Sequence, residues 1–110
     1  MNFRISNAGG VVLVEVEGEL IVGNREEFKQ IVLGQLDGGG RKFVVDFAKS
    51  SYIDSSGLGA LVSLSKKIRE VGGALRLAGL NEDLRTLFDL TKLNTLFQIS
   101  DNRDLALADF

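Results

Sequence analysis

The order of apolar and polar positions along the chain predicts strands that alternate with helices. Residues 11–17 read Val-Val-Leu-Val-Glu-Val-Glu, so that three alternate valines share one face and the two glutamates share the other. This pattern predicts a strand with one solvated face. Residues 3–5 are a candidate partner strand, and the turn falls at residues 7–10, where asparagine and glycine tolerate positive φ angles. We therefore expect the chain to open with a hairpin.

Three amphipathic segments predict helices. Asn24 and Glu27 have the spacing of a capping box, which places a first helix at about residues 25–37. A second helix fits residues 56–71, with its charged side chains mostly on the outer face. Asn81 is the expected cap of a third helix. Each helix has one apolar face and must therefore pack on another element.

Two apolar runs between these helices predict further strands. Residues 42–47 indicate a short, largely buried strand, and residues 74–78 indicate the next one. Residues 96–99 are a candidate last strand before a final turn of helix, capped by Asp101 or Asn102. Because strands alternate with helices from residue 10 onward, we expect an α/β domain with crossover connections.

Composition narrows the class of protein. With 110 residues, 45% of them apolar, the chain can build one core, and one globular domain is expected. A net charge of −2 gives no basic face for a phosphate backbone, so nucleic acid is not an expected partner. No apolar run approaches the roughly 20 residues that cross a bilayer. We therefore expect a cytoplasmic protein without membrane insertion.

The chain contains no cysteine and no histidine. Disulfides, thiol nucleophiles, Ser-His-Asp triads and ordinary zinc sites are thereby excluded, which leaves carboxylates, lysines and hydroxyls as possible chemistry. The glycine triplet at residues 38–40 reads as a helix terminator, because no Gly-Lys-Ser/Thr follows it to form a phosphate cradle. We expect a protein that is not an enzyme and that holds no cofactor and no metal.

Residues 50–59 form a segment dense in small and polar side chains. Capping explains part of it, because Asp54 or Ser55 can accept the free amides of the first helical turn. Capping does not explain Gly57 and Gly59, since each glycine costs about 1 kcal/mol inside a helix relative to alanine. The pattern suggests that a bare backbone is needed there.

A hydroxyl in this segment is a candidate phosphorylation site. The free amides and the dipole of a helix N-terminus both favour negative charge. A phosphoryl group would add about −1.5 to −2 charges beside the carboxylate of Asp54, and this repulsion could turn off binding to a partner protein. Reasoning from the residues alone leaves Ser55 and Ser56 equally open as the acceptor.

Competing motifs fail on their spacing. A nucleophile elbow needs Gly-x-Ser-x-Gly, but the residues two before Ser55 and Ser56 are isoleucine and aspartate. A dinucleotide fingerprint needs a third glycine where this chain has Val62. Asp46 and Asp54 are too few carboxylates for a metal site. None of these three alternatives is therefore expected.

Residues 52–59, Tyr-Ile-Asp-Ser-Ser-Gly-Leu-Gly, resemble the mark of the STAS family and, within it, of the bacterial anti-sigma factor antagonists. That mark is a strand, then Asp-Ser-Ser/Thr-Gly-Leu-Gly, then a helix. Residues 18–20, 72–73 and 87–93 fit the same family, so the likeness covers nearly the whole chain. It implies a single STAS-like α/β domain over residues 1–110, with a mixed four- to five-stranded sheet and helices packed mainly on one face.

The resemblance implies a partner switch. An unphosphorylated antagonist binds an anti-sigma factor and frees a sigma factor for transcription. The anti-sigma factor is also a serine kinase that phosphorylates the antagonist, and a PP2C-type phosphatase resets it. The phosphoacceptor of the family is the serine directly after the aspartate, which maps to Ser55. The partner-binding surface maps to Asp54, Ser56, Gly57, Leu58 and Gly59.

One position departs from the family pattern. Many antagonists carry an aspartate in a loop near the phosphorylated serine, where this chain has Ile21. The partner kinase could differ, the protein could bind without efficient phosphorylation, or the loop could tolerate the change. An alternative function is therefore a STAS binding subunit of a signalling scaffold or a lipid-transport complex, without a phosphorylation cycle. A small enzyme or nucleotide-binding protein is a third reading, which micromolar ATP or GTP binding would reveal.

Overall fold

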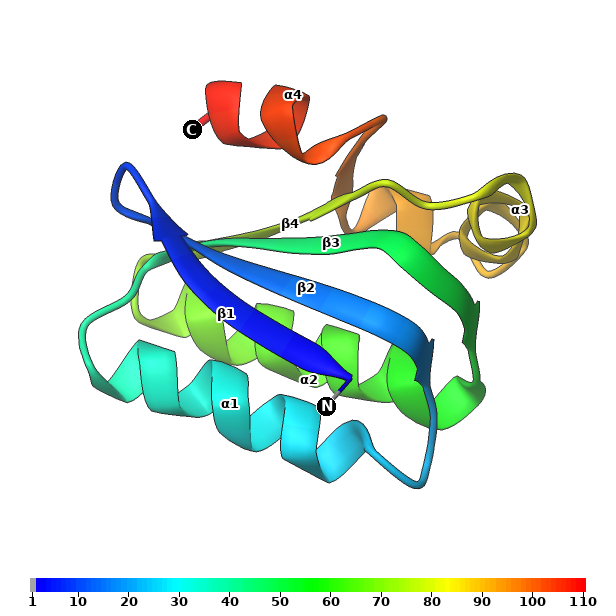
Figure 1. Cartoon of the computed structure of the whole chain (residues 1–110), viewed down its shortest axis with the longest axis horizontal. Helices are drawn as coiled ribbons and strands as arrows, with labels where there is room; N and C mark the ends of the chain where they lie inside the picture. The colour runs from blue at the N-terminus through cyan, green and yellow to red at the C-terminus, as the bar shows by residue number, and fades with distance from the viewer. Residues whose placement is uncertain (1) are drawn as a thin grey trace.

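One mixed sheet of five strands organises the molecule (Figure 1). The computed structural model describes residues 2–110. The strands follow one another across the sheet in chain order; the first two are antiparallel and the others pair in parallel. The expected mixed sheet is confirmed, and so is the opening hairpin. The strands are β1 (Phe3–Ala8), β2 (Val11–Leu20), β3 (Lys42–Ile53), β4 (Ala74–Ala78) and β5 (Gln98–Ser100).

The two longest helices lie side by side on one face of this sheet (Figure 1). These are α1 (Arg25–Asp37) and α2 (Ser55–Glu70). Helix α3 (Glu82–Leu90) lies beyond the ends of the strands, a short 3₁₀ turn (Leu93–Thr95) follows it, and α4 (Arg103–Ala108) covers the opposite face. Helices packed mainly on one face are thus confirmed. None of the helices within residues 2–110 is long and apolar enough to span a membrane.

The main core lies between the sheet and the pair α1 and α2. Alternate valines of β2 face this side, as their spacing predicts. They belong to one cluster with buried side chains from β3, β4 and the helices α1, α2 and α3. Removing this apolar surface from water drives the two layers together. The largest fully buried side chains include Phe28, Phe43, Phe47, Phe88, Leu20, Ile53, Leu61, Leu64, Ile68 and Leu77.

The other face of β2 is not solvated over its first half, from Val11 to Glu15, and there the expectation is wrong; Glu17, further along, is partly exposed. Val11 and Leu13 are only 4% exposed there, and Glu15 is 9% exposed. Helix α4 covers them, and Arg103 from α4 forms an ion pair with the Glu15 carboxylate. The two glutamates predicted a solvent-exposed face. The prediction failed because the pattern of one strand carries no information about a helix from the far end of the chain.

Strand β3 is longer than the apolar run predicted. It begins at Lys42 but extends to Ile53, and its second half pairs with β2 through an irregular register near Gly18. The Ser50 and Ser51 hydroxyls donate to the Gly18 carbonyl at 3.1 and 3.2 Å. These polar residues therefore stay in the sheet, and β3 leads directly into Asp54 and helix α2.

Candidate site at the start of helix α2

Asp54 joins the first turn of α2 to a neighbouring loop. Its backbone is extended, and its Oδ1 accepts a hydrogen bond of 2.8 Å from the Gly57 N–H. Its Oδ2 accepts one of 3.0 Å from the Val22 N–H. Of the two expected capping residues, Asp54 rather than Ser55 is therefore the cap. One side chain thus fixes both the helix start and the loop after β2.

These contacts favour the charged form of the carboxyl group. The hydrogen bond from Gly57 is the main cause that lowers the pKa of Asp54 below its ordinary value. Partial burial acts in the opposite direction, and the N–H groups of Val22 and Ser56 and the charge of Arg25 lower the pKa further. Asp54 is consequently an ionised carboxylate at neutral pH.

The two candidate serines differ in accessibility. Ser55 is the first residue of α2 and is exposed, whereas Ser56 is only partly exposed. Leu58, one turn further, is also partly exposed. Ser55 is therefore the more accessible hydroxyl, although its role as a phosphoacceptor stays a prediction.

Gly57 and Gly59 differ in whether the packing of the fold explains the absence of a side chain. A Cβ atom at Gly57 would clash with the Leu20 carbonyl oxygen and would lie 2.8 Å from Cγ2 of Ile53, so the fold itself requires glycine. Gly57 is buried, and it can influence a partner only through the shape of the helix start. Gly59 is exposed, and a Cβ atom there would meet nothing within 4 Å. Of these two glycines, only Gly59 has no explanation in the packing of the fold.

Asn24 lies at the N-cap position of α1, as predicted, but its side chain does not cap the helix, and that part of the prediction is wrong. It makes no side-chain hydrogen bond to the helix amides. Its Oδ1 instead accepts a hydrogen bond of 2.9 Å from the Ile21 N–H, and its Nδ2 donates one of 2.8 Å to the Glu19 carbonyl. The loop that turns back from β2 brings the Ile21 N–H and the Glu19 carbonyl within reach of Asn24. Its side chain therefore binds these groups and not the helix amides.

Two exposed apolar side chains near the site escaped the sequence analysis. Val22 is 64% exposed in the loop beside Asp54, and Tyr52 is 53% exposed near the end of β3. Ile21, next to Val22, is partly buried. An apolar residue in a loop has no periodic pattern that would predict its exposure, which exists only in the folded chain.

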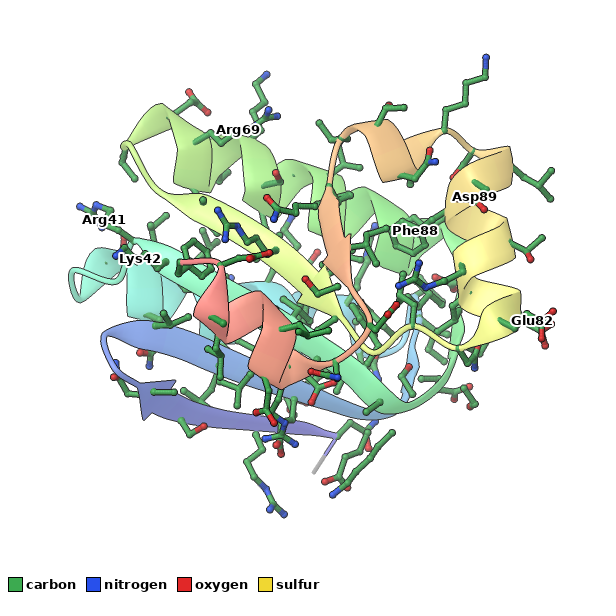
Figure 2. All side chains as sticks on the ribbon, turned by 90° about the horizontal axis from the view of Figure 1, so that it is seen from above. Arg41, Lys42, Arg69, Glu82, Phe88 and Asp89 are labelled. Atoms are coloured by element: carbon green, nitrogen blue, oxygen red, sulfur yellow. The ribbon has the colours of Figure 1, made fainter. Side chains whose placement is uncertain are left out.

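The remainder of the described chain offers no comparable centre. Residues 2–110 contain no group of three or more acidic side chains that could hold a metal. A hollow lined by Asn7, Gln35, Arg41 and Lys42 involves none of the predicted site residues. Figure 2 shows Arg41 and Lys42 at the end of the molecule opposite to α3, where Glu82 and Asp89 are labelled.

Known proteins share the sequence pattern and the fold of this chain. The model of the STAS domain family matches residues 2–106. An anti-sigma-B factor antagonist of Staphylococcus epidermidis is 30% identical over 92 residues, which are 84% of this chain and 85% of that protein. The crystal structure of tm1081 from Thermotoga maritima matches with a TM-score of 0.92 and 29% identity, covering 97% of this chain and 92% of that one.

The anti-sigma factor antagonist SpoIIAA from Bacillus has the same fold. Its phosphorylated form superimposes with a TM-score of 0.77 and 19% identity, over 97% of both chains. This match concerns the architecture, whereas the family match extends over nearly every residue of the domain. The chain belongs to the STAS domain family, and its curated relatives include anti-sigma factor antagonists.

Proposed function

We propose that this protein is an anti-sigma factor antagonist whose binding is controlled by phosphorylation of Ser55. Its partner is an anti-sigma factor that is also a serine kinase, and a PP2C-type phosphatase removes the phosphoryl group. The observation that carries the proposal is the exposed Ser55 hydroxyl at the start of α2, directly after a carboxylate that the backbone holds in place. The Staphylococcus epidermidis relative, an anti-sigma-B factor antagonist, supports the partner class.

The unphosphorylated surface suits close contact with another protein. Ser55 and Leu58 present a small hydroxyl and a partly exposed apolar side chain. Gly59 adds no side chain, so a partner backbone can approach the helix. Asp54 does not demand a cation from the partner, because both of its oxygens already accept backbone hydrogen bonds. Binding therefore requires little rearrangement on this side of the interface.

Phosphorylation turns this surface into a poor one for binding. The kinase transfers the γ-phosphoryl group of ATP to Ser55 Oγ, with release of ADP and the hydroxyl proton. The product carries about −1.5 to −2 additional charges. These charges lie next to the ionised Asp54, and contact with the partner would strip their water. Each 1.4 kcal/mol of this penalty lowers the affinity about tenfold, so the switch needs no refolding.

The test is the position of the phosphoryl group. Incubation with the serine-kinase anti-sigma factor from the same genome and ATP, followed by peptide mapping in a mass spectrometer, should place the label on Ser55. Ser56→Ala should be labelled like the wild type, and Ser55→Ala should not be labelled. Label on Ser56 would contradict Ser55 as the phosphoacceptor, and no label on a chain that binds the kinase would contradict the phosphorylation cycle. Binding without any label would favour the scaffold or lipid-transport alternative.

A further inference from the structure

A hollow of about 470 Å³ lies between the turn after β1 and the C-terminal end of α1. Strand β3 begins at this hollow and leads to Ser55 after its other end, so the two places lie at opposite ends of the sheet. The volume and the polar lining suit a small polar ligand. Apart from Val12, the side chains that line the hollow are polar, namely Asn7, Gln35, Arg41 and Lys42.

The end of α1 fixes the Arg41 guanidinium beside the hollow. Nη1 of Arg41 donates hydrogen bonds to the Leu36 carbonyl at 3.0 Å and to the Gly40 carbonyl at 2.7 Å. Within residues 2–110, its Nε and Nη2 form neither a hydrogen bond nor an ion pair. A guanidinium presents its donors as a planar fork that matches the oxygens of a phosphate or a carboxylate. Arg41 is thus held in place while two of its nitrogens remain available to a ligand.

Lys42 adds a second positive charge to the same hollow and is exposed. Neither Lys42 nor Arg41 pairs with a carboxylate of the described chain, whereas Arg103 pairs with two. Asp37, the acidic residue at the end of α1, does not line the hollow. Two unpaired cations in one concave surface attract an anion.

Gly34 keeps the hollow open at a cost to its helix. It lies within α1, where glycine is less favourable than alanine, yet a Cβ atom there would meet nothing within 4 Å. The packing of the fold therefore does not explain this glycine. Because Gly34 lines the hollow, a side chain at this position would take up space in it. A ligand in the hollow supplies the missing reason for the glycine.

We propose that this hollow binds a small hydroxylated molecule with a phosphate group, such as a sugar phosphate. Two cations favour a phosphate monoester, which carries about −1.5 to −2 charges at neutral pH, over a singly charged carboxylate. The Gly10 N–H donates to Asn7 Oδ1 at 3.1 Å, which leaves the NH₂ group of Asn7 for a ligand hydroxyl, and the Gln35 amide can donate and accept. Side chains bind the ligand, because the N–H groups of residues 38–40 already donate to helix carbonyls.

This site needs neither Ser55 nor the anti-sigma factor, so its test uses the free domain. NMR of the isotope-labelled protein follows the backbone amides while glucose-6-phosphate is added. Saturable shifts should appear at residues 7–10 and 34–42 and not at the start of α2. Glucose should cause none, and inorganic phosphate should bind severalfold more weakly than glucose-6-phosphate because it has no sugar hydroxyls for the two amides.

Removing the two cations should abolish the saturable shifts, and the variant is Arg41→Gln combined with Lys42→Gln. The matched control is Lys66→Gln combined with Lys67→Gln, which removes the same charge from two exposed neighbours on α2 that do not line the hollow. Its affinity should equal that of the wild type. Because Arg41 also binds the end of α1, Lys42→Gln alone serves as a second variant and should weaken binding severalfold.

Gly34→Gln tests whether the open space is used. It should raise the melting temperature, since glutamine favours a helix, and weaken glucose-6-phosphate binding severalfold by filling the hollow. Unchanged affinity would overturn the role of Gly34. Equal losses in the two double variants would assign the effect to overall charge and overturn the site, as would a wild type without saturable shifts. Inorganic phosphate that binds as tightly as glucose-6-phosphate would overturn the hydroxyl contacts.

Discussion

Two groups of charged side chains in this domain are held in opposite ways. At the start of α2, Asp54 remains partly exposed and accepts hydrogen bonds from backbone N–H groups. Beneath α4, Glu15 and Asp46 are buried on neighbouring strands, and Arg103 pairs with both. The first arrangement shapes a surface, whereas the second attaches a helix to the sheet. We therefore expect the loss of the Asp54 charge to change stability little, and the loss of the Arg103 charge to change it much more.

The difference follows from what happens when one partner is removed. At the start of α2, the exposed Val22 N–H can bond to water if the Asp54 carboxylate is lost, so this loss costs little. Two carboxylates packed side by side under a helix have no such replacement, because water reaches them poorly. Burial, rather than the number of charges, therefore decides which group carries stability.

The largest expected effect breaks the buried group. Arg103→Met should lower the free energy of unfolding by about 3 kcal/mol, because it leaves Glu15 and Asp46 buried without a counter-charge. Urea unfolding measures the loss. Arg85→Met is the matched control: Arg85 pairs with Asp101 at 2.7 Å, but the Asp101 side chain is 80% exposed and is hydrated without its partner, so the loss should stay below about 1 kcal/mol. Equal losses for the two variants would contradict the comparison.

The next effect tests the two glycines that follow Asp54 in helix α2. Gly57→Ala should destabilise the domain by about 1–3 kcal/mol, because the added methyl group collides with the Leu20 carbonyl. Gly59→Ala should instead stabilise it by up to about 1 kcal/mol, since alanine favours a helix and the space is open. Thermal unfolding of both variants provides the measurement. Destabilisation by both changes would show that Gly59 also has a packing role.

The smallest effect is the pH dependence of Asp54. Its lowered pKa contributes stability that is fully present above the unfolded pKa of about 3.9 and is lost as the pH falls through the folded value. Asparagine can still cap a helix, so the free energy of unfolding of the wild type should exceed that of Asp54→Asn only modestly at neutral pH. That difference should disappear in acid. Unfolding experiments on the pair over a pH series check this, and a difference independent of pH would contradict the assigned cause.

Local periodicity was enough to predict much of the fold. Helix α1 at 25–37 and strand β4 at 74–78 have the bounds that their apolar spacing predicts, and Asn81 caps α3 as expected. In each case neighbouring residues determine the structure. The end of β3 was missed because polar residues such as Ser50 and Ser51 stay in the sheet through contacts with Gly18, more than thirty positions away.

At the site, too, features set by neighbouring residues could be predicted, whereas features set by distant residues could not. The motif located the start of α2 to within one residue and left its cap open between Asp54 and Ser55, of which the structure selects Asp54. It could not reveal that Asn24 turns from its own helix to the loop, since that choice depends on the path of β2. It also could not show that Gly57 is required by the Leu20 carbonyl. The exposure of Val22 likewise exists only in the folded chain.

The affinity of Ser55 variants for the anti-sigma factor tests the central claim most directly. Titration calorimetry should find that Ser55→Ala binds like the unphosphorylated wild type. Ser55→Asp should bind at least about tenfold more weakly, a difference of about 1.4 kcal/mol or more, because its charge adjoins Asp54. Ser56→Asp, one position further on, should have a smaller effect. Equal affinities of Ser55→Ala and Ser55→Asp would contradict the switch.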